Sequence, residues 1–482
     1  MNKRLLVHLL GDILLIEAAA MLPSLLISLI YGDGDARAFV VTIIVLCLMG
    51  LPARLLARPR ETNLRAREGF VTVALAWVLL SAFGALPFVI SGVIPHFADA
   101  YFEAVSGFTT TGASVMTVID GMPRGVMFWR SFTHWIGGMG VLVLTLALLP
   151  KMTGRTSHLM RAESPGPSFS KIVPKLSDSA KILYIIYGVL TLIEFIALLL
   201  CGMNAYDAAI HAMGTAGTGG FSNYGASVGA FDSVAVDIVV TVFMVIFGVN
   251  FALFYRVLVG DWKGALKSEE LHWYLGIFGA SALFITLMIT PQYGSVFKAL
   301  RYSTFQTATI MSTTGYATAN FDLWPEAVKM LMVILMFVGS CAGSTAGGMK
   351  VVRVALMSKL SLREVRHTFQ PRKVQVVRFE GKGVEESMLT QIATFCFVYV
   401  LLILLGAFVI SLDGAHGFMA NLTAAITCMC NVGPGLGAVG PAGNFAAYSP
   451  FSKIVLSMLM LCGRLELFPI LVLFHPAIWR RG

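Results

Sequence analysis

A short polar stretch that contains glycine recurs four times in a sequence that is otherwise apolar. The stretches begin at Phe108, Gly217, Ser312 and Cys430 and read FTTTGA, GTGGFS, STTGYA and CNVGPG. Each follows a segment that is too short to cross a bilayer, which takes about 20 residues as a helix. The chain therefore has to be explained as four copies of one unit, in which polar backbone interrupts apolar sequence.

The four stretches have the composition of an ion filter. Glycine permits backbone angles that turn successive carbonyl oxygens toward one axis, and such oxygens replace the water around a cation. Ordinary turns between membrane helices use the same residue types, but recurrence in four copies favours a filter. Aligned on their glycines, the stretches match as Thr111-Gly112, Thr218-Gly219, Thr314-Gly315 and Val432-Gly433. The predicted ion-binding residues are Thr110, Thr111, Gly112, Gly217, Thr218, Gly219, Thr313, Thr314, Gly315, Asn431, Val432 and Gly433.

Composition places the chain in a membrane. Of its 482 residues, 57% are hydrophobic and 13% are charged, whereas soluble domains average roughly 25% charged residues. Several apolar stretches are long enough to cross a bilayer, and they continue to the C-terminus, which leaves no room for a large soluble domain. The first stretch, from about Leu5 to Ile30, lacks a small-residue cleavage signature, so we expect a retained helix and not a removed signal peptide.

The positions of the basic residues predict the orientation of the chain. The net charge is +9, and most of the 35 Lys and Arg residues fall in alternate loops. If the N-terminus is cytoplasmic, these loops are cytoplasmic as well, which satisfies the positive-inside rule and places both termini in the cytoplasm. Binding to nucleic acid is not needed to explain the basic balance. The richest basic segment runs from Lys350 to Lys382.

The seven cysteines carry no sign of a disulfide framework or a metal site. They lie in or beside apolar stretches, and none belongs to a CxxC pair or has a histidine at metal-ligand spacing. We interpret them as small core residues. The sequence predicts no cofactor.

The order of apolar segments predicts an all-α integral membrane protein. Two helices, at 5–31 and 38–57, precede four tandem repeats of helix, pore loop and helix around a central pore. Two leading helices and two crossings per repeat make ten crossings, an even number that agrees with both termini on one side. The predicted units are a helix pair at 1–60 and repeats at 61–160, 161–262, 263–360 and 361–482.

Within each repeat we expect a spanning helix, a short helix that enters from outside, the glycine stretch, and a second spanning helix. All repeats share one orientation, which relates them by an axis along the membrane normal. A short helix that enters from outside points its carbonyl end toward the bilayer centre, where the partial negative charge favours a cation. Irregular backbone at this depth is tolerable where it lines water or is buried in protein. The short helices are predicted at 98–109, 204–216, 297–311 and 416–429, and the second helices at 126–150, 232–260, 325–357 and 448–477.

The second helix of the third repeat is interrupted by a polar run from Gly339 to Gly348. Each glycine costs a helix roughly 1 kcal/mol relative to alanine, so the run needs another reason to be there. We predict a flexible gate that lies across the conduction path. A phosphate-binding loop is excluded by spacing, while a small-residue packing face remains the alternative. The predicted gate residues are Gly343, Ser344, Thr345, Ala346, Gly347, Gly348 and Lys350.

Two charged residues, Arg464 and Glu466, lie inside the last apolar segment. A charge at this depth is costly and usually faces a cavity or the bundle interior. Residues two apart do not face each other on a helix, so these two are not expected to be partners. We interpret Arg464 as a pore-facing barrier to cations, and the alternative is an ion pair with Glu194 or Glu103.

Six stretches, spread in order over nearly the whole chain, carry a resemblance to a known family. They are EAVSGFTTTG from Glu103, WIGGMG from Trp135, TGGFS from Thr218, GSTAGGMK from Gly343, NVGPGLG from Asn431 and GRLE from Gly463. In these the chain resembles the Trk/Ktr/HKT superfamily of potassium transporters, specifically its TrkH and TrkG branch. The two leading helices fit this branch better than the shorter KtrB branch.

The resemblance implies a four-repeat, channel-like pore for potassium in the bacterial cytoplasmic membrane. It further implies a homodimer and a cytoplasmic ring of RCK-type, TrkA-like subunits that bind nucleotide and control the pore. The family's intramembrane loop falls on Gly343 to Lys350, and its pore arginine falls on Arg464. Sodium-conducting members have serine at the position of Gly112, so potassium is expected here. The second filter departs from the pattern, since Gly217 adds a glycine before Thr218.

Other functions remain open alternatives at this point. A sodium-permeable or a proton- or sodium-coupled cation carrier would share the same fold. A membrane-embedded enzyme would need a nucleophile with a base or a metal set, and neither His-Glu-x-x-His nor Gly-x-Ser-x-Gly occurs. His134 and His211 stand alone and are expected to be packing or interface residues. A passive scaffold would explain the basic segment from Lys350 to Lys382, as would attraction to anionic lipid.

Overall fold

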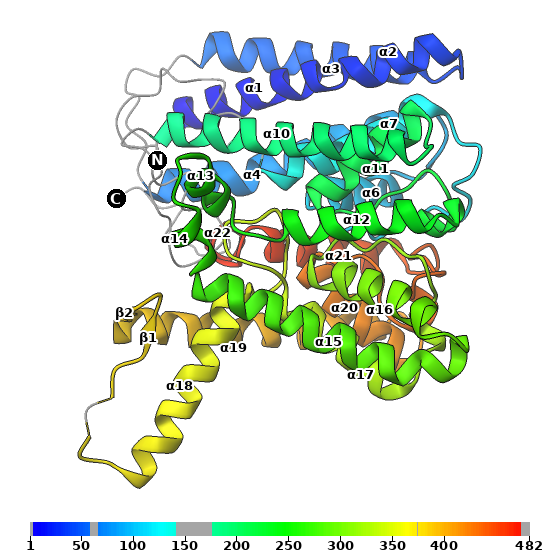
Figure 1. The fold of residues 1–482 in the computed structure, drawn as a ribbon. Coiled ribbons are helices and arrows are strands. Elements are labelled where there is room, and N and C mark those ends of the chain that lie inside the picture. The colour runs from blue at the N-terminus through cyan, green and yellow to red at the C-terminus, as the bar shows by residue number, and fades with distance from the viewer. Residues whose placement is uncertain (1–2, 58–65, 141–175, 374, 474–482) are drawn as a thin grey trace.

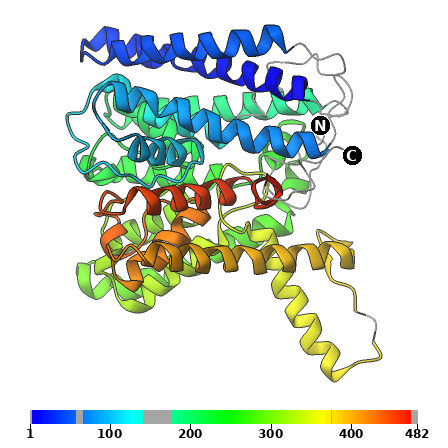
Figure 2. The ribbon, with the colours of Figure 1, turned by 180° about the vertical axis from the view of Figure 1, so that it is seen from behind.

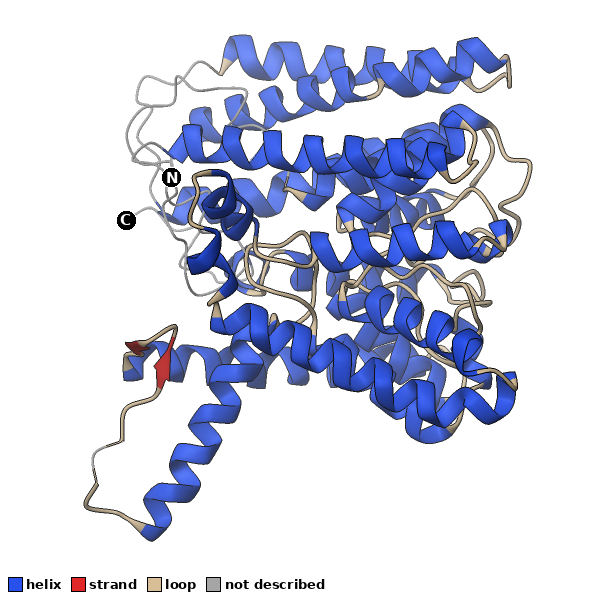
Figure 3. Cartoon of the chain, viewed as in Figure 1, coloured by secondary structure: helices blue, strands red, loops and turns tan. Residues whose placement is uncertain are grey.

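Most of the computed structural model is helical, and it describes residues 3–57, 66–140, 176–373 and 375–473 (Figures 1 and 3). Three leading helices come first: α1 (Lys3–Ala20), α2 (Leu22–Tyr31) and α3 (Ala36–Leu56). They lie along one edge of the molecule, beside the helices of the first repeat (Figure 1). The all-α prediction is confirmed, and the first predicted helix is divided at Met21, after which α2 begins with Pro23 in its first turn.

The remaining helices form four similar groups. The first is α4 (Ala66–Gly84), α5 (Leu86–Ile90), α6 (Phe97–Phe108) and α7 (Arg124–Gly138). The second is α10 (Leu176–Leu200), α11 (Ala205–Gly217), η1 (Ser227–Phe231), α12 (Val234–Phe247), α13 (Phe251–Leu258) and α14 (Trp262–Leu266). The third is α15 (Glu269–Tyr293), α16 (Val296–Met311), η2 (Phe321–Leu323), α17 (Glu326–Val338) and α18 (Val351–Phe369). The fourth is α19 (Glu386–Ser411), α20 (Phe418–Cys430), η3 (Gly437–Val439), α21 (Pro450–Arg464) and α22 (Phe468–Leu473).

Six helical segments among the described residues are long and apolar enough to cross a membrane. They include the first helix of every repeat, and the four short helices α6, α11, α16 and α20 follow them within two residues of the predicted bounds. Much of the surface of these long segments is apolar and exposed, as in Leu192 of α10 and Leu287 of α15. The chain is therefore a multi-pass membrane protein, because water would not tolerate so much exposed apolar surface.

The second helices of the repeats are not continuous, and for the second and fourth repeats the prediction of one spanning helix is wrong. In the second repeat α12 and α13 meet at an angle of 92°. The break falls at Gly248–Asn250, where the Asn250 side chain accepts a hydrogen bond from the backbone of Ala252 and so starts a new helix. In the fourth repeat α21 ends at Arg464, before Glu466 and Leu467 adopt positive φ angles of 56° and 65°. In the first repeat α7 ends at Gly138, and the rest of the predicted helix lies outside the described residues.

The interruption predicted in the third repeat is confirmed, since residues 339–350 separate α17 from α18. Beyond it the helix α18 continues through residue 360, where the sequence placed a boundary between repeats. It stands away from the other helices, and the chain after it runs back to a two-stranded antiparallel sheet, β1 (Arg378–Phe379) with β2 (Lys382–Gly383) (Figures 1 and 2). The Lys359 ammonium, in the middle of α18, donates to the carbonyl of Arg378 in this sheet. The basic segment is therefore partly a helix and not only a linker.

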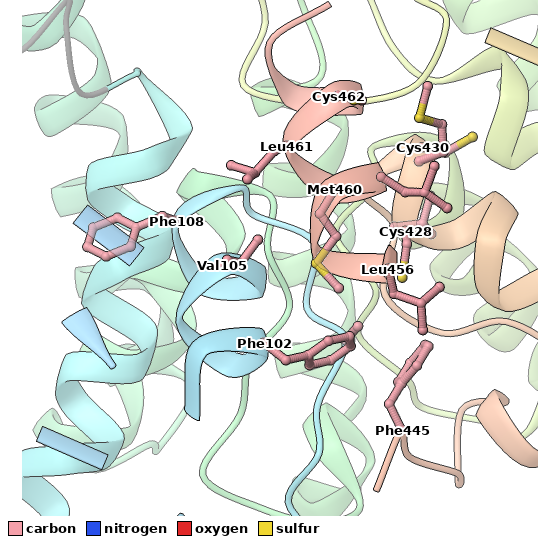
Figure 4. Packing of buried hydrophobic residues seen from close by; sticks show 14 of the residues in the cluster. Phe102, Val105, Phe108, Cys428, Cys430, Phe445, Leu456, Met460, Leu461 and Cys462 are labelled. Atoms are coloured by element: carbon pink, nitrogen blue, oxygen red, sulfur yellow. The ribbon is translucent and has the colours of Figure 1, made fainter. Parts of the chain in front are cut away.

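The short helices and second helices of different repeats share one core. Phe108 points to the opposite side of α6, toward Trp129 of α7, whereas Phe102 and Val105 of α6 face side chains of α20 and α21, which belong to the fourth repeat (Figure 4). Met460 and Phe445 lie between them, and the rings of Phe102 and Phe445 are 5.4 Å apart. The first and last repeats are therefore packed side by side, as closure around one axis requires.

Candidate functional site

Each of the four short helices ends in the same way. The residues Thr110, Thr218, Thr313 and Asn431 all have a φ of 55° or 56°, in the left-handed region. The amide of each donates to the carbonyl three residues earlier, and the next amide donates to the carbonyl five residues earlier, at 2.8–3.0 Å in the latter case. This is the Schellman ending of a helix, in which the left-handed residue reverses the chain and satisfies the last carbonyls.

Threonine rarely adopts this left-handed conformation, because its branched side chain crowds the backbone. Such a conformation persists where the surroundings fix it. The Thr218 hydroxyl donates to the carbonyl of Gly217 at 2.6 Å, and the Thr313 hydroxyl accepts from the amide of Gly347 at 2.7 Å. The side-chain amide of Asn431 donates to the Thr111 hydroxyl at 3.0 Å. Neighbouring groups therefore stabilise the turn in these three loops.

The four loops close into a ring through their glycines. Gly112, Gly220, Gly315 and Gly433 have positive φ angles between 76° and 102°. A Cβ atom added to any of them would crowd a backbone carbonyl oxygen of the next repeat, and the fourth glycine meets the first repeat again. The oxygens belong to Gly219, Thr314, Val432 and Thr111, in that order. Only glycine fits in such contacts, so the ring brings the four loops around one axis as predicted.

The ring corrects the alignment of the second loop. The sequence matched Gly219 to Gly112, but the counterpart of Gly112 in conformation and contacts is Gly220. Thr218 then corresponds to Thr110, and Gly219 corresponds to Thr111. The reason is physical: α11 ends with its left-handed residue at Thr218, and the amide of Gly219 bonds to the carbonyl of Gly214 at 2.9 Å. Three glycines in Gly217–Gly220 hid this register from the sequence.

The imidazole of His134 explains why the second loop has glycine where the others have a β-branched residue. A Cβ atom on Gly219 would lie 2.2–2.4 Å from three atoms of the His134 ring, which is too close for any side chain. The ring is held by a 2.7 Å hydrogen bond between Nδ1 and the carbonyl of Gly107, and it packs on Phe221 with ring centroids 4.1 Å apart. His134 therefore packs against the second filter loop, in agreement with the expectation of a packing residue.

Above the ring lies a cavity of about 360 Å³. Its lining includes Gly112, Gly220, Gly315 and Gly433, one from each loop, together with Arg130. An ion that approached the ring from this side would meet backbone from all four repeats.

Below the ring, the polar run of the third repeat lies against the inner ends of two loops. The Gly347 amide donates to the Thr313 hydroxyl at 2.7 Å, and the Gly348 amide donates to the carbonyl of Cys430 at 2.9 Å. A Cβ atom on Gly347 would crowd the same carbonyl of Cys430. We call residues 339–350 the intramembrane loop. It is coil and turn, and it contacts the filter directly, which no continuous packing helix would do.

The intramembrane loop is tied to the break between α12 and α13. The Cys341 amide donates to the carbonyl of Gly248 at 3.0 Å, and the Phe251 amide donates to the carbonyl of Gly343 at 3.1 Å. From the start of α15, a carboxylate oxygen of Glu270 accepts from the Ala342 amide at 2.6 Å. Other loop contacts come from Thr345, whose hydroxyl donates to the carbonyl of Phe247, and from Lys350, whose ammonium donates to the carbonyl of Ala346.

Arg464 extends beneath the filter and donates to three backbone carbonyls. Its partners are Thr345 in the intramembrane loop and Gly137 and Gly138 at the end of α7, each at 2.6 Å. Of the two acids proposed as partners, Glu103 is paired with Arg130 at 2.6 Å.

Glu466 pairs with Arg353 of α18 at 2.5 Å, so the two charges of the last segment have different partners, as predicted. Because Arg464 donates to the carbonyl of Thr345, it forms one connected layer with the intramembrane loop beneath the filter.

Comparison with known proteins identifies the family. A model of the TrkH family, described as a cation transport protein, matches residues 36–280 and 285–481. The chain belongs to the TrkH family. Its relatives include the Trk system potassium uptake proteins TrkH and TrkG of Escherichia coli, at 35% and 30% identity. The alignments cover 100% of both chains for TrkH and 99% of both for TrkG.

A solved structure agrees with this membership. The crystal structure of the potassium transporter TrkH from Vibrio parahaemolyticus superposes with a TM-score of 0.90 at 33% identity, over 100% of both chains. TrkH family membership confirms the resemblance that the sequence motifs indicated, and it confirms a transport protein over a membrane-embedded enzyme.

Sequence reasoning missed one part of the site, the buried charges beside the filter. Glu103 was considered only as a partner of Arg464, and Arg130 was not singled out. Both are buried, with side chains 0% and 2% exposed. The available signal was a charged residue in each of two segments that enter the membrane, which by itself marks a functional position.

Proposed function

We propose that this chain carries potassium ions inward across the bacterial cytoplasmic membrane through a path lined by its four filter loops. The observation that supports it most is the closed ring of glycines, each set against a carbonyl oxygen of the next repeat. Backbone carbonyls in such a ring replace the hydration shell of a cation. Relatives over the full length are named potassium uptake proteins.

The proposed potassium ligands are the predicted filter residues, with Gly220 added after the register correction. They are Thr110, Thr111 and Gly112; Gly217, Thr218, Gly219 and Gly220; Thr313, Thr314 and Gly315; and Asn431, Val432 and Gly433. In each loop, the backbone N–H of the residue after the left-handed turn donates to a carbonyl of the preceding short helix. This leaves the carbonyl oxygens available for an ion.

Uptake is tested in a cell that lacks its own potassium uptake systems. Expression of the chain should restore growth at low external potassium, and the Gly112→Ser variant should reduce the preference for potassium over sodium. The Gly92→Ser variant is the matched control, because Gly92 has a similar φ of 78° but has open space around it. A chain that reaches the membrane and moves neither ion would overturn the proposal.

One observation favours the alternative, a sodium-permeable or a proton- or sodium-coupled cation carrier. The second loop has Gly219 where the other three have Thr111, Thr314 and Val432, and glycine is the most conformationally free residue. If the second filter loop is more flexible than the other three, the ring would discriminate less between potassium and sodium. Reversal potentials in reconstituted bilayers under potassium, sodium and pH gradients separate a passive potassium path from either alternative.

The intramembrane loop is our proposed gate, with Gly343, Ser344, Thr345, Ala346, Gly347, Gly348 and Lys350 as its moving part. Its contacts with Thr313 and Cys430, at the inner ends of two filter loops, support this proposal. Arg464 is the proposed barrier, a fixed positive charge in the same layer. Movement of the loop would change both the steric and the electrostatic obstacle to a cation.

A cytoplasmic, RCK-type, TrkA-like subunit is our proposed regulator, and the start of α15 would transmit its effect. Glu269 forms an ion pair with Lys359 of α18 and accepts from the amide of Glu380 in the turn between β1 and β2. The next residue, Glu270, holds the intramembrane loop at Ala342. Force applied to α18 or to the β turn would therefore reach the loop through two adjacent residues.

The surface available to this subunit is strongly polar. A cavity of about 310 Å³ on α18 is lined by charged residues that include Arg363, His367, Arg372 and Lys373. Hydrogen bonds to Glu386 and Glu364 hold the pKa of Arg363 above its usual range, so this residue stays charged.

Binding is tested by co-purification of the subunit with wild-type protein and with an Arg372→Glu/Lys373→Glu variant, which should lose the subunit while retaining the fold. Retention of the subunit by this variant would contradict the docking surface.

We also propose that the chain forms a homodimer with both termini in the cytoplasm. The exposed apolar side chains of α10 and α15 offer surfaces for a second copy or for lipid. Mass measurement in detergent, before and after cross-linking, determines the assembly. Accessibility of tags at the two ends determines the orientation.

A further inference from the structure

Arg130 and Glu103 form an ion pair that is almost entirely removed from solvent, beside the filter. The Arg130 Nε atom lies 2.6 Å from a carboxylate oxygen of Glu103, and the two side chains are 2% and 0% exposed. Arg130 lies in α7 and Glu103 in α6, so the pair joins the second helix and the short helix of the first repeat. Burial of two charges is costly, and an apolar pair of similar volume is often at least as stable. Stability alone therefore does not explain the pair.

Glu103 holds the outer arm of the first filter loop. Its carboxylate accepts from the Ser114 hydroxyl at 2.9 Å and from the Val115 amide at 2.8 Å. Ser114 lies two residues after Gly112, the glycine of the ring. The same carboxylate thus fixes both Arg130 and the chain directly above the ring.

Arg130 holds the corresponding arm of the second filter loop. Its Nη1 atom donates to the carbonyl of Ser222 at 3.0 Å, and its guanidinium lies 3.5 Å from the ring centroid of Phe221. Ser222 lies two residues after Gly220, so it is the counterpart of Ser114 in the corrected register. The ion pair therefore connects equivalent positions of two neighbouring loops.

We propose that Glu103 and Arg130 are positioning residues that set the spacing between the first and second filter loops, and thereby the preference for potassium over sodium. This inference rests on the proposed function. The second loop needs such support most, because Gly219 gives it more backbone freedom than the other loops have. A guanidinium is suited to the role, since its planar donors and its face engage three partners at once.

The test is a double substitution, Glu103→Gln with Arg130→Met, which removes both charges and leaves no buried charge unpaired. The purified protein should keep its thermal stability and elution volume, while the potassium-to-sodium permeability ratio falls by about three- to tenfold, the range for residues that act through their neighbours. The matched control is Asp99→Asn with Lys453→Met. That pair also joins α6 to a second helix, at 2.6 Å, but it does not contact a filter loop. The control should leave the ratio unchanged.

A second variant, Phe221→Leu, keeps both charges and removes the aromatic face under Arg130. It should lower the ratio by a smaller factor, and it provides the test if the double variant does not fold. An unchanged ratio in the folded double variant, or in Phe221→Leu where the double variant does not fold, would overturn the inference. If the wild-type protein itself shows no preference for potassium, or if Gly112→Ser leaves the preference intact, the proposed function fails instead.

Discussion

The guanidinium of Arg464 donates a 2.6 Å hydrogen bond to the carbonyl oxygen of Thr345, and so connects this partly buried cation of the fourth repeat to the intramembrane loop of the third. The same guanidinium donates to Gly137 and Gly138 of the first repeat. One side chain therefore joins three repeats beneath the filter. The barrier and the gate, which the sequence presented as separate features, are in direct contact.

We predict that Arg464→Ala raises cation flux and leaves the folded protein intact. The substitution removes a fixed positive charge from the path and releases Thr345, so it lowers the electrostatic obstacle and loosens the loop together. Arg464→Lys is the control, because it keeps the charge with fewer donors and should stay closer to wild-type flux. Flux and thermal stability are measured on the same preparations. A loss of folded protein without any gain in flux would instead assign Arg464 a structural role.

We predict that Glu270→Ala raises the open probability of the pore, because the Ala342 amide loses its acceptor at the edge of the intramembrane loop. Glu270→Gln is the matched control, since its amide oxygen can still accept this hydrogen bond. Single-channel recordings should therefore rank open probability as Ala variant above Gln variant, with the Gln variant near wild type. If both variants raise the open probability equally, the charge of Glu270, and not the hydrogen bond, sets the position of the loop.

We predict that deletion of part of Ala342 to Gly347 gives a pore that conducts without its cytoplasmic subunit. A shortened loop cannot lie across the path while it also contacts Thr313 and Gly248. The measurement is single-channel recording of the deletion variant with and without the subunit. The gate assignment is lost if a purified, dimeric deletion variant stays shut, or if it opens only when the subunit is added.

The short helices were predictable because each is a segment too short to cross a bilayer that leads into a polar stretch with glycine. The sequence placed them at 98–109, 204–216, 297–311 and 416–429, and the structure has them within two residues of those bounds. The intramembrane loop was predictable for a similar reason, since its glycines and hydroxyl residues are costly in a helix.

The break between α12 and α13 was not predictable in this way. It rests on one glycine and one asparagine in an apolar run, and its position depends on contacts with Cys341 and Gly343 from another repeat. The register of the second filter loop also depends on a distant residue, because the His134 ring occupies the space beside Gly219. The pairing of Glu103 with Arg130 is likewise a contact between two separate helices. Local sequence signals do not contain such long-range information.

We predict that Gly463→Ala destabilises the protein, because the added methyl group would overlap the carbonyl oxygen of Met429 at the end of α20. Overpacking of this kind costs typically 1–3 kcal/mol, and backbone cannot move aside as a side chain can. Gly276→Ala is the matched control, since Gly276 lies inside the helix α15 with open space around it. That change should be neutral, or stabilising by up to about 1 kcal/mol. Thermal unfolding in detergent compares the two, and equal melting temperatures would contradict the close contact.

The corrected register of the second loop gives a final prediction, which concerns Gly219 and Gly220. Gly220→Ser should lower the potassium-to-sodium permeability ratio in the same direction as Gly112→Ser, because both glycines have positive φ and face a carbonyl of the next repeat. Gly219→Thr should instead lower the yield of folded protein, because the new side chain meets the ring of His134. In a His134→Ala background the same threonine has space, and the second loop then carries the Thr-Thr-Gly pattern of the first and third.

The combined His134→Ala/Gly219→Thr variant should therefore recover more folded protein than Gly219→Thr alone, whereas His134→Ala should not restore the selectivity of Gly220→Ser. Yield, elution volume and reversal potential are measured for Gly220→Ser, for Gly219→Thr and for each of these combined with His134→Ala. If Gly219→Thr folds normally in the presence of His134, or if Gly220→Ser leaves selectivity unchanged, the corrected register is wrong. Gly219, and not Gly220, is then the counterpart of Gly112. The expected pattern would mean that His134 supplies, from a neighbouring helix, the bulk that a β-branched side chain supplies in the other three loops.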